Sequence, residues 1–163
     1  LNAARPVAFV SKSDVRQWPL IGWLAARTDT VFLRRGSRGH AKLVNAEIDA
    51  LLNAGKDVAL FPEGTTTDGT HLLGFHAALL QPAVETGRPI QPIALCYEGD
   101  DGERSLAPAY AGETTLMESL RAILCTRGIT ARALALPALP PHGYNRRELA
   151  LSARARITTS LGV

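Results

Sequence analysis

The sequence predicts an α/β fold, in which a mainly parallel or mixed β-sheet is flanked by α-helices. Short β-branched or apolar runs alternate along the chain with longer segments of helical periodicity, which is the order that strands joined by crossover helices produce. Several helical segments end at a glycine, as helix C-termini often do. The length of 163 residues, with 46% hydrophobic and 20% charged side chains, suits one globular domain over residues 1–163 and excludes disordered, collagen-like and coiled-coil proteins.

The expected strands are short apolar runs. They cover Val7 to Val10, Val31 to Leu33, Val58 to Phe61, Ile90 to Tyr97 and Ile129 to Leu136. The third run is wholly apolar and ends at Pro62, as a buried parallel strand would. Residues 99–112 are rich in Gly, Asp and Pro, so we expect a surface excursion there.

Segments of helical periodicity lie between and after the strands. They cover Gln17 to Arg27, His40 to Ala54, Phe75 to Thr86, Thr114 to Arg127 and a C-terminal segment that begins near Asn145. Three of them are expected to end at Gly55, Gly87 and Gly128. Asn145 and Glu148 have the spacing of a capping box, which satisfies the first amide groups of a helix.

Apolar spacing predicts which helix faces are buried. The inner residues of the second helix are Val44, Ile48, Leu51 and Leu52. Those of the fourth helix are Leu116, Leu120, Ile123 and Leu124. The first helix crowds aromatic and aliphatic bulk into one short stretch, which suits a helix at a membrane surface as well as a core helix: Trp18, Leu20, Ile21, Trp23 and Leu24.

The charge balance excludes one class of partner. The net charge of +3 is too small to indicate a nucleic-acid surface, which usually shows a dense basic stripe. All but three of the 18 basic residues are arginines, whose planar fork suits phosphate or carboxylate, although a coding bias would produce the same excess. No GxxxxGK[ST], GxGxxG or GxSxG motif supports a nucleotide enzyme or a serine hydrolase.

The cysteines and the termini carry weaker signals. Cys96 and Cys125 lie in apolar stretches without CxxC or Cys/His spacing, so we expect buried reduced thiols and no metal site. No apolar stretch reaches about twenty residues, so no segment is expected to span a membrane. Leu1 is not Met and no leader precedes the first strand, which suggests an N-terminally truncated chain.

The most informative stretch is LFPEGTTTDG at residues 60–69. A strand that ends at Pro62 places Glu63 at the carboxyl edge of the sheet, where open α/β sheets bind ligands. Glu63 could accept a hydrogen bond from a substrate hydroxyl or orient another group. Gly64 would let a backbone amide approach a ligand, and Thr65 and Thr66 could bind phosphate. A polar loop of turn residues is the alternative interpretation.

A second candidate site is the run Arg34-Arg35-Gly36-Ser37-Arg38, between a strand and a helix. Guanidinium groups beside the amide groups of a helix N-terminus make an anion site. A solvated basic turn is the alternative.

Three stretches occur in an order known from one family. They are Phe32-Leu33-Arg34-Arg35 with Arg38 three residues on, then Phe61-Pro62-Glu63-Gly64-Thr65, then Ile90-Gln91-Pro92-Ile93. They resemble the second, third and fourth blocks of the glycerolipid acyltransferases typified by lysophosphatidic-acid acyltransferase. The resemblance extends over nearly the whole chain, and Phe-Pro-Glu-Gly-Thr is its most specific part.

The resemblance implies transfer of a fatty acyl group from a thioester of coenzyme A or acyl carrier protein to a lysolipid hydroxyl, with no bound cofactor. In the family a first block, His-x-x-x-x-Asp, supplies the general base and the carboxylate that orients it. No histidine here has an aspartate at that offset; the four are His40, His71, His76 and His142. We expect surface or packed imidazoles at all four, a base upstream of Leu1, and no activity from this chain alone.

The resemblance also implies roles for individual residues. Arg35 and Arg38 would bind the phosphate of the acceptor. Glu63 would position the acceptor and, with Gly64, line its site. Pro92 would shape the floor of the cleft or the acyl-donor side.

Two positions depart from the family pattern. Arg34 stands where the family usually has an acid, and Thr66 stands where it usually has an arginine after Gly-Thr. Thr65, Thr66 and Arg34 are further candidates for substrate contact. The Gly-Thr-Thr-x-Asp-Gly form also resembles acyltransferases that make bacterial ornithine lipids, whose acceptor has no glycerol phosphate.

The resulting hypothesis is a bacterial lysolipid O-acyltransferase of phospholipid biosynthesis. We expect it on the membrane surface at the cytoplasmic face of the inner membrane, bound peripherally or by an N-terminal segment outside this sequence. Lyso-ornithine lipid is the alternative acceptor. The alternative from another class is a non-catalytic module that binds anionic lipid or phosphate.

Overall fold

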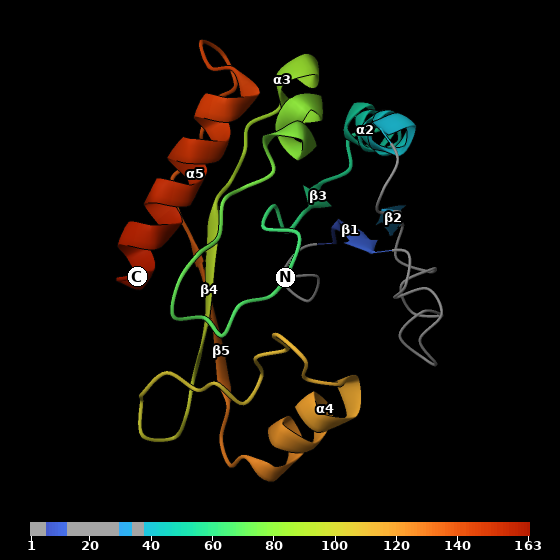
Figure 1. The fold of residues 1–163 in the computed structure, drawn as a ribbon. Coiled ribbons are helices and arrows are strands. Elements are labelled where there is room, and N and C mark those ends of the chain that lie inside the picture. The colour runs from blue at the N-terminus through green and yellow to red at the C-terminus, as the bar shows by residue number, and fades with distance from the viewer. Residues whose placement is uncertain (1–5, 13–29, 34–37) are drawn as a thin grey trace. The chain divides into compact units, whose positions relative to one another are not determined.

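A computed structural model of the chain describes residues 6–12, 30–33 and 38–163 (Figure 1). The helix expected over Gln17 to Arg27 lies outside these residues. The chain divides into two compact units. Unit 1 comprises Leu1–Pro62, His76–Ile90 and Pro140–Leu149, and unit 2 comprises Glu63–Phe75, Gln91–Leu139 and Ala150–Val163.

Unit 1 contains a sheet of three parallel strands. They are β1 (Ala8–Lys12), β2 (Val31–Leu33) and β3 (Val58–Ala59), in the order β2-β1-β3. Val10 lies opposite Val31, and Ala8 lies opposite Val58. The three expected strands are confirmed, but β3 is shorter than predicted because its ladder with β1 ends at Ala59. Phe61, expected inside a buried strand, is 57% exposed.

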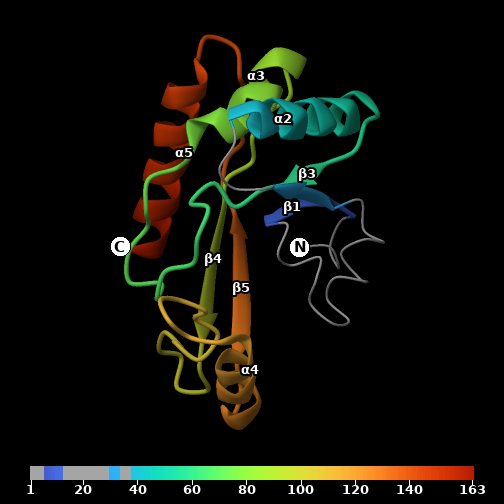
Figure 2. The same cartoon turned by 45° about the vertical axis from the view of Figure 1, so that its right-hand side comes forward.

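Helix α2 (Arg38–Asn53) lies over this sheet in both views (Figure 1, Figure 2). Its inner side chains Val44 and Ile48, 1% and 2% exposed, form one apolar cluster with Val10 and Val31 of the strands. The helix ends as predicted at Gly55, whose φ of 77° is left-handed. The amide groups of residues 55 and 56 donate to the carbonyls of residues 52 and 51, at 3.1 and 3.0 Å, and so satisfy the last turn.

The helix predicted from Phe75 begins later. A 3₁₀-helix, η2 (Ala77–Leu80), leads into α3 (Gln81–Thr86), which ends as expected at Gly87, with a φ of 65°. The helix starts after His76 because this residue has an extended backbone conformation and its amide donates to the carbonyl of Pro62 at 2.8 Å. Pro82 then lies in the first turn of α3, where a missing N–H costs nothing.

Unit 2 contains an antiparallel pair of strands, β4 (Ile93–Glu98) and β5 (Thr130–Ala135). Ile93 lies opposite Ala135, and Glu98 lies opposite Thr130. The strand expected from Ile90 starts at Ile93 because Pro92 has no N–H to donate to a ladder. Parallel and antiparallel sheets with flanking helices confirm the predicted α/β class.

Helix α4 (Leu116–Cys125) lies at the end of the pair where β4 stops and β5 starts (Figure 2). A capping box opens it: the Thr115 hydroxyl accepts from the amide of Glu118 at 3.3 Å, and Glu118 Oε2 accepts from the amide of Thr115 at 2.7 Å. These Thr115 amide and hydroxyl bonds lower the pKa of Glu118. At the other end, the Thr126 hydroxyl donates to the carbonyl of Ala122 at 2.7 Å. The helix therefore ends before Gly128, where we expected it to end.

The predicted inner face of α4 is wrong. Leu120, Ile123 and Leu124 are 39%, 37% and 83% exposed, while Ser119 is the buried residue, 6% exposed. The spacing identifies an apolar face, but the described residues leave that face uncovered. Cys125, which we expected to be buried, is exposed, and both it and Cys96 are free thiols.

Helix α5 (Arg146–Leu161) confirms the predicted capping box. Asn145 Oδ1 accepts from the amides of Arg147 and Glu148 at 2.9 and 3.1 Å, and Glu148 Oε2 accepts from the amide of Asn145 at 2.8 Å. Residues 99–112 form turns on the surface, as expected. No helix within the described ranges is long and apolar enough to cross a membrane.

Candidate functional site

The loop of residues 63–75 carries the residues that the sequence singles out. Its first residue, Glu63, is half-buried, and its Oε2 accepts a hydrogen bond from the amide of Leu73 at 2.9 Å. This bond closes the base of the loop across ten residues. Gly64 follows with a φ of 68°, a left-handed conformation that a side chain would strain. The carboxylate of Glu63 is therefore held in place, and a carboxylate can still accept bonds at its second oxygen.

Polar side chains fold the tip of the loop on itself. Thr67 Oγ1 accepts from the amide of Gly69 at 3.1 Å and donates to the carbonyl of His71 at 3.1 Å. Asp68 Oδ1 accepts from the hydroxyl and the amide of Thr70 at 2.7 and 2.9 Å. The Thr70 hydroxyl, followed by its amide, lowers the pKa of Asp68, so this carboxylate is ionised at neutral pH. His71 Nδ1 lies 3.6 Å from Asp68 Oδ1 on the surface.

Two arginines from other parts of unit 2 bind the backbone of this loop. Arg154 of α5 donates from Nε to the carbonyl of Leu73 at 2.8 Å and from Nη2 to the carbonyl of Leu72 at 2.6 Å. Arg104 donates from Nη1 to the carbonyl of Gly69 at 2.6 Å. Neither residue can be recognised from the sequence as a support of this loop, because partners up to 82 positions apart leave no local pattern.

The other predicted site residues have different surroundings. Thr65 and Thr66 are exposed on the loop. Pro92 is buried in the same unit, and its carbonyl accepts from the amide of Leu136 at 3.0 Å, so it anchors the start of β4 beside the end of β5. Arg38 is the first residue of α2 in unit 1. Arg34 and Arg35 lie outside the described residues.

Surface or packed imidazoles were expected at all four histidines, and the structure describes three of the side chains. His71, His76 and His142 are all exposed.

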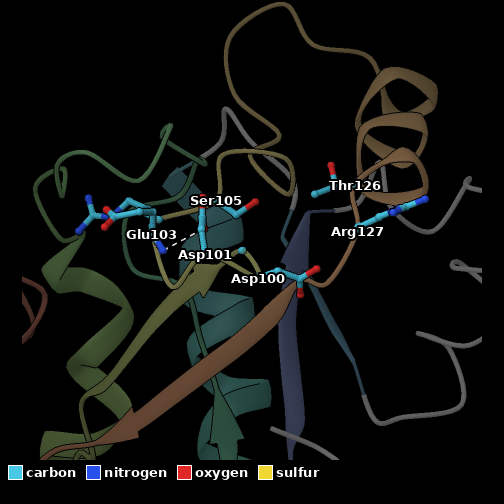
Figure 3. A pocket seen from close by; sticks show the side chains of 8 residues that line it. Asp100, Asp101, Glu103, Ser105, Thr126 and Arg127 are labelled. Carbon is cyan, nitrogen blue, oxygen red and sulfur yellow. Dashed lines mark hydrogen bonds between the residues drawn. The ribbon is translucent and has the colours of Figure 1, made fainter.

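A hollow of about 390 Å³ lies in unit 2 between the excursion after β4 and the end of α4 (Figure 3). Its lining combines carboxylates with arginines: Gly99, Asp100, Asp101, Glu103, Arg104, Ser105, Thr126 and Arg127. The amide of Glu103 donates to Asp101 Oδ1 at 3.0 Å, so the acidic turn satisfies part of its own polarity. Gly128 lies beside the carboxylate of Asp100 and has a φ of 56°, a left-handed conformation that explains the glycine. The lining contains none of the predicted site residues, although Arg104 also binds the loop that carries Glu63.

The sequence is similar to a known protein family and to individual members of it. The Acyltransferase family model matches residues 1–96, more than half of the chain. The chain belongs to the acyltransferase family. Within this family it is 38% identical over 161 residues to the lyso-ornithine lipid O-acyltransferase of Pseudomonas aeruginosa, covering 99% of this chain and 62% of that protein. It is 33% identical over 132 residues to the 1-acyl-sn-glycerol-3-phosphate acyltransferase of Neisseria meningitidis, covering 81% of this chain and 51% of that protein.

A solved acyltransferase shows the same fold. The crystal structure of the 1-acyl-sn-glycerophosphate (LPA) acyltransferase PlsC from Thermotoga maritima superimposes with a TM-score of 0.64 at 19% identity, covering 96% of this chain and 56% of that one. The chain therefore spans between about half and about three fifths of the length of these acyltransferases.

Proposed function

We propose that the protein transfers a fatty acyl group from the thioester of coenzyme A or acyl carrier protein to the hydroxyl of a lysolipid, with no bound cofactor. The observation that carries the proposal is Glu63, which stands in the Phe-Pro-Glu-Gly-Thr block and is held by the amide of Leu73 at 2.9 Å. Family membership and the names of the relatives support the same reaction. A fixed carboxylate suits a group that must orient an acceptor hydroxyl before it reacts.

The reaction forms one bond and breaks another. The acceptor oxygen attacks the thioester carbonyl carbon, a C–O bond forms, the C–S bond breaks, and the hydroxyl proton passes to a general base while the thiol leaves. In this scheme Glu63 accepts a hydrogen bond from the acceptor, with Gly64, Thr65 and Thr66 beside it. Arg34, Arg35 and Arg38 bind the anionic head group, and Pro92 shapes the floor of the cleft or the donor side.

We assign the role of general base to none of these 163 residues. None of the four histidines has an aspartate five positions on, so we infer that this chain by itself does not complete the transfer. We propose that the complete protein acts on the cytoplasmic face of the inner membrane, bound at the membrane surface peripherally or by a segment outside this sequence. Fractionation of bacterial membranes, with washes at high salt, tests this placement.

Lysophosphatidic acid and lyso-ornithine lipid are the two candidate acceptors. The lyso-ornithine lipid is favoured by a specific observation, because Thr66 replaces the usual arginine and the relative named for this substrate matches 99% of the chain. A missing arginine would remove a charge-assisted contact to phosphate that is worth about 1.5–3 kcal/mol. Arg34 argues for lysophosphatidic acid, since it adds a cation in the preceding sequence block.

The test uses the complete protein, palmitoyl-CoA and palmitoyl-acyl carrier protein as donors, and both lysolipids as acceptors. We expect acyl transfer to at least one lysolipid, and Glu63→Gln should lower turnover by a factor of about ten or more, the loss expected for a charge-assisted hydrogen bond. Glu47→Gln, an exposed carboxylate of α2, is the matched control and should keep full turnover. Retained lipid binding without transfer would favour the non-catalytic module. Full turnover of both Glu63→Gln and Arg35→Ala would refute the site assignment.

A further inference from the structure

The side chain of Arg154 makes two hydrogen bonds to a loop whose bonded residues precede it by 81 and 82 positions. It is half-buried on α5, and its guanidinium fork reaches two successive carbonyls, those of Leu72 and Leu73, at 2.6 and 2.8 Å. Bonds from a charged donor at these lengths are the stronger class of hydrogen bond in proteins. A lysine could not match this geometry, because an ammonium is a point charge rather than a planar fork.

One of these bonds is connected directly to Glu63. The carbonyl of Leu72 and the amide of Leu73 belong to the same peptide unit, which is planar and rigid. Arg154 binds the oxygen of this unit, and Glu63 accepts its N–H at 2.9 Å. The C=O and the N–H of this unit point in opposite directions within one plane, so a bond that holds the oxygen also fixes the direction of the N–H. A cation on the carbonyl also polarises the peptide and makes its N–H a better donor.

The rest of the loop has supports of its own. Arg104 binds the carbonyl of Gly69 at 2.6 Å, and the Thr67 and Asp68 side chains close the tip. The loss of Arg154 would therefore release the peptide between residues 72 and 73 without removing the loop's other bonds.

We propose that Arg154 is the positioning residue for Glu63. It holds the Leu72–Leu73 peptide so that the amide of Leu73 fixes the Glu63 carboxylate toward the acceptor. The inference rests on the role of Glu63 in the proposed function. Arg154 itself contacts no reacting atom in this scheme.

A double-mutant cycle in the complete protein tests the inference. Turnover is measured for Arg154→Ala, Glu63→Gln and the double variant, with palmitoyl-CoA and the lysolipid that the wild type acylates, in neutral detergent micelles. We expect Arg154→Ala to lower kcat about tenfold to a hundredfold, the range that misplacement of a catalytic group produces. In the Glu63→Gln background the same change should lower kcat less than about twofold, because the group being positioned is already lost. Arg154→Lys should recover part of the loss.

Arg156→Ala is the matched control. Arg156 lies on the same helix and donates to a carbonyl, that of Pro137 at 2.8 Å, and no hydrogen bond among the described residues joins its side chain to the loop. We expect wild-type kcat from this variant. Thermal unfolding is measured for every variant, and Arg154→Lys replaces Arg154→Ala in the cycle if the alanine variant does not fold.

Amide hydrogen exchange at Leu73 provides a readout that does not depend on acyl transfer. Arg154→Ala should raise the exchange rate of this amide at least about tenfold, while Arg156→Ala should not change it. Additive losses in the cycle, or unchanged exchange at Leu73, would overturn the inference. Full turnover of Glu63→Gln would instead refute the proposed role of Glu63, so the two failures are distinguishable.

Discussion

The packing of α2 on the parallel sheet leads to a prediction with a clear magnitude. Ile48 is 2% exposed and lies in one cluster with Val10, Val31 and Val44. Ile48→Ala deletes three carbons, which at about 0.8 kcal/mol for each buried methylene gives a transfer loss of about 2.4 kcal/mol. The cavity that remains adds to this loss, so we expect the free energy of unfolding to fall by about 3–4 kcal/mol.

Leu43 provides the matched control, because it lies on the same helix and is 62% exposed. Leu43→Ala should change stability by less than about 0.5 kcal/mol, as surface substitutions usually do. The assay is urea-induced unfolding of the complete protein, followed by far-UV circular dichroism, with the denaturant slope checked for each variant. A cost below about 1 kcal/mol for Ile48→Ala, or an equal cost for both variants, would refute the packing of α2 on β1 and β2.

Two further predictions concern single polar side chains. Asn145→Ala removes the acceptor of the amides of Arg147 and Glu148 and should destabilise the protein by about 1 kcal/mol, whereas Asn145→Ser should keep most of the cap; thermal unfolding measures both. Asp49 should respond in the opposite direction, because burial and then the charge of Glu85 raise its pKa, so its ionised form opposes folding at neutral pH. Asp49→Asn should therefore raise the melting temperature at pH 7, and this gain should disappear below about pH 4, where the carboxyl is protonated in both states. A gain that persists in acid would contradict the cause assigned to Asp49.

The elements that the sequence predicted best are those that carry their own local signals. The strand Val31–Leu33 matches its prediction residue for residue, because β-branched and aromatic residues there are followed at once by a polar run. Gly55 and Asn145 mark helix ends through backbone chemistry that involves only neighbouring residues. Such local signals do not depend on tertiary contacts with the rest of the chain.

Burial was harder to predict, because it depends on the partner as well as on the pattern. The stripe of α2 and the stripe of α4 have similar spacing, yet Ile48 is 2% exposed and Leu124 is 83% exposed. The difference lies in the sheet that α2 covers. The capping box of α4 at Thr115 was not predicted, although Glu118 has the required spacing, because the predicted helix starts at Thr114, two residues before the observed start at Leu116.

The candidate site shows the same division between local and distant information. Glu63 could be found from the sequence because its block is contiguous, whereas nothing in the sequence distinguishes Arg154 from the other arginines. The excess of Arg over Lys first suggested anion binding. In unit 2, however, Arg104, Arg154 and Arg156 all donate to backbone carbonyls. A fork with five N–H donors can hold two carbonyls at once, which a lysine ammonium does with less directional precision. Part of the arginine excess therefore serves to fix loops, and an arginine count by itself does not locate an anion site.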